Sequence, residues 1–212
     1  MQSLHYKIIV FSLLLVAFSS CDYAKRMKWD EKDVSEVKVH NNFFNNPKMD
    51  YIYKAKINVL DNDFGGKVIV KKTDSLTHRV VFATEFGNTI FDFSITPTSY
   101  HVNSILDQID KKVLVKTLAL DFQNMISTDY QVIKQYSSGQ DVFLNAEVGK
   151  RQNYYLYKDL NGELSQINST KGGKEKTITI FKEIQYGVAH EIDIQHQNID
   201  MNIHLNFIGS TF

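Results

Sequence analysis

The sequence contains one cysteine, Cys21, and two prolines, Pro47 and Pro97, in 212 residues. An intramolecular disulfide needs two thiols, so the fold must be held together by its core alone. Aromatic residues are abundant by contrast, with 11 tyrosines and 14 phenylalanines. Many aromatic residues together with few prolines favour extended sheet, because aromatic side chains pack well on a pleated surface.

An excess of charge of either sign is also missing. Lysine plus arginine and aspartate plus glutamate each number 24, so the net charge is zero. A protein without a basic surplus has no general attraction for a polyanion, which argues against nucleic acid as a partner. The hydrophobic fraction of 43% argues against disorder.

The sequence has no apolar run long enough to cross a bilayer as a helix. Its longest run, Ile8 to Phe18, is interrupted only by Ser12 and has about half of the ~20 residues that a spanning helix needs. His5 and Lys7 precede this run, and Ser19, Ser20 and Cys21 follow it. A basic flank, a short apolar core and small residues are typical of a secretory signal peptide.

Small residues followed by Cys21 resemble the lipobox of bacterial lipoproteins, with Phe18 at the place where leucine is usual. The resemblance implies cleavage before Cys21 and attachment of a diacylglyceryl group to its thiol. The partner would then be a membrane, contacted through an N-terminal lipid anchor, and the location the cell envelope, at the outer membrane. The alternative is an ordinary secreted protein that is cleaved near Ser20 and keeps Cys21 as a free thiol.

Three parts are expected along the chain. Residues 1–20 form the lipoprotein signal peptide, residues 21–48 a lipid-anchored polar tether, and residues 49–212 a single antiparallel β-rich domain. The tether is predicted because residues 22–46 are mostly charged or polar and pass into an asparagine-rich loop.

Alternation of apolar and polar residues predicts the first strands. It begins at Tyr51 and recurs in residues 67–71, 79–84 and 89–95, separated by short turns that include one over residues 61–66. Four strands at a spacing of about ten residues predict an antiparallel meander.

The period changes in residues 104–126, where apolar residues recur at helical spacing. Leu114, Leu118, Phe122 and Met125 share one stripe, which predicts an amphipathic helix lying on the sheet. Asn103 or Ser104 is its expected N-cap. Strands are expected again in residues 141–146, 153–158, 164–169, 176–184, 189–196 and 199–207.

The predicted fold class is α+β and mostly β: a curved antiparallel sheet, or unclosed half-barrel, with one or two helices on its concave face. So many strands in one layer usually curve or close. This order of parts resembles the lipoprotein-carrier fold of LolA and LolB. The block from Arg79 to Phe93 also resembles a block in Bacteroidetes outer-membrane lipoproteins. The carrier resemblance implies an apolar hollow, covered by helices, that shelters acyl chains.

Nine side chains are predicted to line this hollow for a hydrophobic ligand. The alternative is that the strand residues pack directly on the helix and leave no room. The nine are Tyr53, Ile57, Val68, Phe82, Phe91 and Phe93 on strands, and Leu114, Leu118 and Phe122 on the helix.

Catalytic motifs are absent: there is no Gly-x-Ser-x-Gly, no Walker loop and no His-Glu-x-x-His. His190 and His196 on one strand are separated by about 20 Å at ~3.3 Å per residue, so they cannot share a metal, although His204 on the next strand could approach one of them. Asp92 is expected to pair with Arg79, and Glu85 to bond turn amides.

Asp121 interrupts the apolar stripe of the helix and is expected to bond a buried hydroxyl or a lysine. These residues predict no catalytic site, no metal and no cofactor. The sequence therefore indicates a non-catalytic, lipid-anchored envelope protein that binds a hydrophobic ligand or a lipoprotein acyl chain. The alternative is a structural or interaction subunit of an envelope complex, without a ligand cavity.

Overall fold

A computed structural model describes residues 22–59, 62–158 and 162–211. The predicted signal peptide and Cys21 lie outside the described residues. The elements in chain order are α2 (Tyr23–Arg26), β1 (Asp30–Lys32), β2 (Asp50–Val59), β3 (Asn62–Lys72), β4 (His78–Ala83), β5 (Thr89–Ile95), β6 (Tyr100–Ile105), the 3-10 helix η1 (Asp107–Ile109), α3 (Lys112–Ile126), β7 (Val132–Ser138), β8 (Asp141–Val148), β9 (Arg151–Lys158), β10 (Leu164–Lys171), β11 (Lys174–Gln185), β12 (Val188–His196) and β13 (Met201–Thr211).

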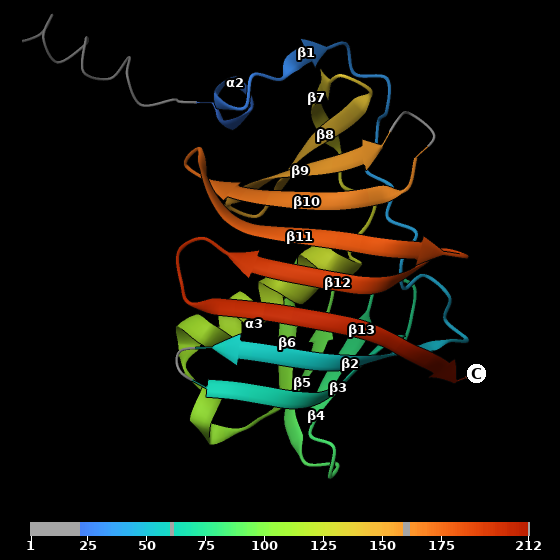
Figure 1. The fold of residues 1–212 in the computed structure, drawn as a ribbon, viewed down its shortest axis with the longest axis vertical. Helices are drawn as coiled ribbons and strands as arrows, with labels where there is room; N and C mark the ends of the chain where they lie inside the picture. Colours follow the sequence, from blue (N-terminus) through green and yellow to red (C-terminus); the bar gives the residue numbers. More distant parts are fainter. Residues whose placement is uncertain (1–21, 60–61, 159–161, 212) are drawn as a thin grey trace, which may run out of the picture.

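All thirteen strands belong to one antiparallel sheet in the order β1-β7-β8-β9-β10-β11-β12-β13-β2-β3-β4-β5-β6. β1 and β6 are its two edges, so the sheet is open. In Figure 1, α3 lies behind β12 and β13, and the strands β4 to β6 run behind β2 at a steep angle to it. The predicted half-barrel with a helix on its concave face is therefore confirmed.

The main core lies between α3 and the concave face. Alternate residues of β2 are buried, from Tyr51 to Val59, and the intervening residues from Lys54 onward are exposed. This is the period-two burial that the sequence predicts for a sheet with one face in the core. Arg79 on β4 and Asp92 on β5 form the expected ion pair, with Arg79 Nε donating to Asp92 Oδ1 at 3.0 Å.

The segment expected to be a tether is folded against the sheet. Asp22 is the N-cap of α2, and its carboxylate accepts a hydrogen bond from the amide of Ala24 at 3.2 Å. Tyr23 is 2% exposed, and the Trp29 ring stacks on Phe143 with 3.8 Å between centroids. Aromatic side chains scattered among charged ones bury enough apolar surface to hold this segment, which its average polarity concealed.

The same segment continues into the main core. Val39, Phe43 and Phe44 are all buried there. Asn41 Nδ2 donates to the carbonyl of Met125 at 2.8 Å, which satisfies one of the free carbonyls at the end of α3. Both faces of the sheet are covered at β8. Phe143 packs in a cluster with Tyr23 on one face, while its neighbours Val142 and Leu144 join the main core on the other.

The predicted helix begins later than expected. Residues 100–105 form β6, and α3 begins after Lys111 with no side-chain cap. Asn103 is not an N-cap, because its amide donates instead to Asp92 Oδ1 at 2.9 Å across the β5–β6 pair. The apolar stripe of α3 is as predicted, with Leu114, Leu118 and Phe122 buried. No helix among the described residues is long and apolar enough to cross a membrane.

Gly65 and Gly66, expected in a turn, lie inside β3. A Cβ atom on Gly66 would stand 2.0 Å from the carbonyl oxygen of Ala83, whereas a Cβ on Gly65 would meet nothing within 4 Å. Only a glycine therefore fits at position 66, where β4 approaches β3.

Gly66→Ala should destabilise the protein by about 3 kcal/mol, because backbone must move to admit one methyl group. Gly65→Ala is the matched control and should change the free energy of unfolding by about 0.5 kcal/mol or less. Urea unfolding followed by circular dichroism compares the two. Equal stability of both variants would contradict this role for Gly66.

Candidate functional site

The nine residues predicted to line a hollow are brought together where α3 meets the concave face of the sheet. Each is at most 7% exposed, and all belong to one apolar cluster. Tyr53, Val68, Phe82 and Phe91 form a row across four neighbouring strands, since each is paired with the next. The sequence thus identified the apolar surface of the concave face.

Side chains of α3 occupy the space above this row. The ring of Phe122 lies 5.5 Å from that of Phe91, which in turn stacks on Phe93 at 4.7 Å. Tyr53 donates from its hydroxyl to the carbonyl of Ala189 at 2.9 Å. A ligand at this site would therefore take the place of α3 side chains, and the assignment of these nine residues to a ligand stays a prediction.

A pocket of about 390 Å³ opens at the C-terminal end of α3. Its lining includes Ile95 and Ile126, which are also members of the apolar cluster. Leu76, which is 63% exposed, and Pro97 stand with them. The pocket therefore connects solvent with the edge of the apolar cluster.

A buried polar contact joins α3 to β12. His196 Nε2 lies 2.9 Å from Asp121 Oδ2, and the two side chains are 1% and 0% exposed. The expected partner of Asp121 was a hydroxyl or a lysine; the structure provides a histidine because α3 passes over the end of β12. Burial raises the pKa of Asp121, and the hydrogen bond with His196 opposes this shift.

The hydrogen bonds of His196 define where its protons lie. Nδ1 is 3.0 Å from the backbone carbonyl of Met201, which can only accept, so Nδ1 carries a proton. The Asp121–His196 contact then needs a second proton, shared between Nε2 and the carboxyl oxygen. The pair is neutral overall and bonds α3 to the sheet within an apolar core.

Two further polar contacts hold α3. Asn153 on β9 donates from Nδ2 to Asn124 Oδ1 at 2.9 Å. Gln123 donates from Nε2 to the carbonyl of Thr96 at 2.7 Å. The helix is thus fixed both by its apolar stripe and by hydrogen bonds, one of which comes from Asp121 within that stripe.

Three buried oxygen atoms of the described residues have no hydrogen-bond partner: Asp121 Oδ1, Asn153 Oδ1 and Thr177 Oγ1. All three lie in this polar layer, since Thr177 is paired with His196 on one side and with Ser169 on the other, and Ser169 is paired with Asn153. An unsatisfied buried polar group costs about 1–3 kcal/mol. Of the three, only Asp121 belongs to α3; Asn153 is on β9 and Thr177 on β11.

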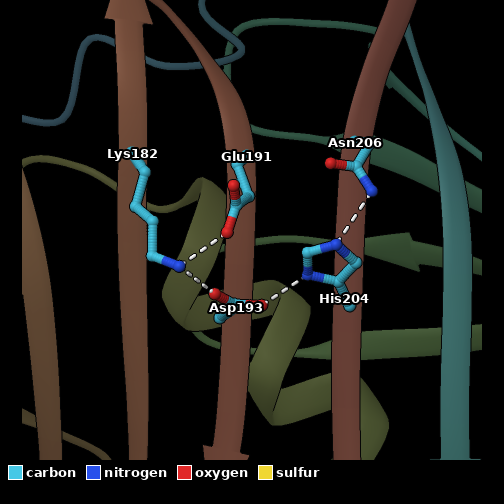
Figure 2. Close-up of polar contacts among 5 residues, drawn as sticks. All are labelled: Lys182, Glu191, Asp193, His204 and Asn206. Atoms are coloured by element: carbon cyan, nitrogen blue, oxygen red, sulfur yellow. Dashed lines mark hydrogen bonds and ion pairs between the residues drawn. The ribbon is translucent and has the colours of Figure 1, made fainter.

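A second cluster lies on the opposite, solvent-facing side of the sheet. Single ligand atoms of Glu191, Asp193 and His204 all lie within 4.8 Å of one another, close enough for one metal ion. Figure 2 shows that Lys182 already reaches into this cluster, with its ammonium 2.6 Å from both Glu191 Oε1 and Asp193 Oδ2. A divalent ion would have to displace that cation.

His204 is also engaged by protein groups. Asn206 donates from Nδ2 to His204 Nε2 at 2.8 Å, so the proton is on Nδ1, which donates to Asp193 Oδ1 at 2.5 Å. We assign the cluster as an ion-pair network. The sequence allowed His204 to approach either His190 or His196. The His190 ring instead lies 5.2 Å from Phe207, and His196 bonds Asp121.

Sequence reasoning missed two features of the structure, the buried Asp121–His196 contact and an aromatic cluster beside α2. It did not identify the pairing of Asp121 with His196, because these residues are 75 positions apart and nothing local connects them. The aromatic cluster of Tyr23, Trp29 and Tyr154 was also missed. Its signal was the one tryptophan of the chain standing in an otherwise charged segment.

The fold has a counterpart among solved structures. The chain is similar to a LolA superfamily protein from Nitrosomonas europaea, with a TM-score of 0.53 and 9% identity over 81% of this chain and 90% of that one. At this identity the likeness shows the fold alone, and the class of structure is a LolA-like open half-barrel.

Two other structures overlap less well, each with a TM-score of 0.46. One is a DUF1329 family protein from Desulfovibrio piger, with 6% identity over 80% of this chain and 87% of that one. The other, described as an outer membrane lipoprotein-sorting protein domain, is from Vibrio parahaemolyticus, with 9% identity over 77% and 85%. No protein-family model and no curated protein matches the sequence.

His196→Leu should destabilise the protein by about 3–5 kcal/mol, because it leaves Asp121 buried without a partner. The double variant Asp121→Leu/His196→Leu should lose less than the sum of the two single variants. Urea unfolding measures the coupling, and His101→Leu on exposed β6 is the control, with an effect of about 0.5 kcal/mol or less. Additive single effects would show that the contact does not hold α3.

Proposed function

We propose that this protein is a non-catalytic, lipid-anchored protein of the cell envelope, located at the outer membrane. It binds a hydrophobic ligand or a lipoprotein acyl chain between α3 and the concave face of the sheet. The observation that carries the proposal is the apolar cluster between α3 and the sheet, which borders a solvent-connected pocket.

The construction of the α3 contact supports this function. An acyl site needs apolar walls, and the row from Tyr53 to Phe91 provides them. An occupant must also displace α3, which breaks the buried bonds of Asp121 to His196 and of Asn124 to Asn153. Exposure of the unpaired Asp121 Oδ1 to water offsets part of this cost.

The fold and the leader sequence point to the same class of function. The structure from Nitrosomonas europaea carries a superfamily name that refers to LolA, and the sequence resembles a lipoprotein precursor up to Cys21. An acyl-binding protein tied to a membrane would keep its site close to the source of its ligand.

A photoactivatable fatty acid tests the site in the full chain within its own membranes. Cross-linked peptides should map to residues 112–126 and 89–95. Leu118→Trp should abolish this labelling, since Leu118 is 2% exposed and the larger ring fills the space under α3. Val113→Trp on the same helix is the control, because Val113 is 73% exposed.

Circular dichroism establishes that both variants are folded. Labelling that persists in folded Leu118→Trp, or that maps to other residues, would refute the acyl site. Absence of labelling together with one membrane protein copurifying in equal amount would favour the alternative, a structural subunit of an envelope complex.

The anchor has a separate test. Cys21→Ala should move the protein from the membrane fraction to the soluble fraction, because each acyl CH₂ contributes about 0.8 kcal/mol to membrane binding. Mass spectrometry of the wild-type protein should show a lipid-modified N-terminal Cys21. Full membrane partitioning of Cys21→Ala would contradict lipid anchoring. This result would not bear on the proposed acyl site.

A further inference from the structure

The apolar inner face of the sheet ends at a lysine. On β3, Val68 and Val70 are buried, and Lys72 occupies the next position of the same face. Lys72 is paired with His78 on β4, and His78 is paired with Ile95 on β5. These three residues are neighbours at one end of the concave face, and all three line the pocket at the C-terminal end of α3.

The ammonium group of Lys72 has little protein contact. It donates from Nζ to Asn45 Oδ1 at 3.3 Å, and no carboxylate of the described residues lies within 4.0 Å of it. The carboxylate of Asp74, in the hairpin that follows Lys72, instead accepts from the amides of Leu76 and Thr77 at 2.8 Å each. An ammonium group has three donors, so two donors of Lys72 remain for a ligand.

The histidines of the lining add little positive charge beside Lys72. Burial lowers the pKa of His78, which favours its neutral form. Its Nε2 donates to the carbonyl of Phe44 at 3.0 Å, since that oxygen can only accept. His40 is exposed and lies 3.7 Å from the carboxylate of Glu36. Lys72 is therefore the cation that a ligand meets in this pocket.

The charge of the pocket fits a ligand with a single negative charge. Asp129 also lines the pocket, from the segment after α3, but it is exposed, whereas Lys72 is only partly exposed. Water therefore weakens the field of Asp129 more than that of Lys72. A carboxylate is balanced by one ammonium group, whereas a phosphate monoester carries about −1.5 to −2 and would keep excess charge.

Apolar surface adjoins the ammonium group. Ile95 and Ile126 line the pocket and belong to the apolar cluster between α3 and the sheet. Leu76 and Pro97 add apolar surface from two exposed connections. The volume of about 390 Å³ is within the usual range for small-molecule sites. One cation next to an apolar surface is the arrangement that suits an amphiphile with a charged end.

We propose that this pocket holds the carboxylate of a long-chain fatty acid, with Lys72 as its ionic contact. The inference rests on the proposed acyl site, because the alkyl chain continues from the pocket into the space between α3 and the sheet. It narrows the ligand class: a free fatty acid is preferred to an uncharged lipid with the same chain.

Two photoactivatable probes test this contact in the full chain within its own membranes. One is a fatty acid, and the other is the primary alcohol with the same chain, which lacks the charge. The measured quantity is the half-saturating concentration of the alcohol divided by that of the acid. Each probe partitions into the membrane equally in every sample, so a change in this ratio between variants reports on the protein.

Lys72→Met should lower the ratio about tenfold, as expected for the loss of one charge-assisted hydrogen bond. Lys67→Met is the matched control, because it removes the same charge from the exposed opposite face of β3, and it should leave the ratio unchanged. Lys72→Arg keeps the charge and should retain most of the preference for the acid. Circular dichroism establishes that the variants are folded, and Lys72→Gln replaces Lys72→Met if the latter does not fold.

An equal ratio in the wild type, folded Lys72→Met and Lys67→Met would overturn the carboxylate contact. The acyl site would then stand, because both probes would still label residues 112–126. Loss of the preference in Lys67→Met as well would also overturn the role of Lys72. Absence of saturable labelling by either probe is a different result, which would refute the acyl site and this inference with it.

Discussion

A single antiparallel sheet of thirteen strands with both edges open has an inner face that must be covered, and the structure depends on how this is done. Open sheets beyond about ten strands curl, and curling here brings β4 to β6 behind the front strands (Figure 1). One amphipathic helix, α3, is placed in the resulting concavity. The apolar stripe of α3 and the aromatic rows of β2 to β5 thus form one core.

The connection between helix and sheet has two parts with different properties. The apolar part is non-directional and would accept another apolar occupant with little loss, because burial depends mainly on area. The polar part, around Asp121, His196 and Asn153, is directional and leaves buried oxygens unsatisfied. The helix is thus held both by non-directional apolar burial and by directional polar contacts.

The N-terminal segment packs on both faces of the sheet. Tyr23 and Trp29 cover the outer face of β7 to β10, while Phe43 and Phe44 enter the main core and Asn41 bonds the end of α3. The segment nearest the predicted anchor is therefore part of both packed layers. A protein tied to a membrane through this segment would present its α2 end toward the anchor.

Local pattern in the sequence determined most of the strands, the apolar stripe of α3 and the Arg79–Asp92 pair, because each rests on a period of two or 3.6 residues or on one hairpin. It did not predict β1, β6 or β7. It failed where distant segments decide the outcome. Position 66 lies in a strand and needs a glycine, because the carbonyl of Ala83 on the neighbouring strand approaches it. Tyr23 is buried because it packs on Tyr154 of β9. Only the tertiary structure brought Asp121 to His196, since partners far apart in the chain meet through the curvature of the sheet, which no local pattern records.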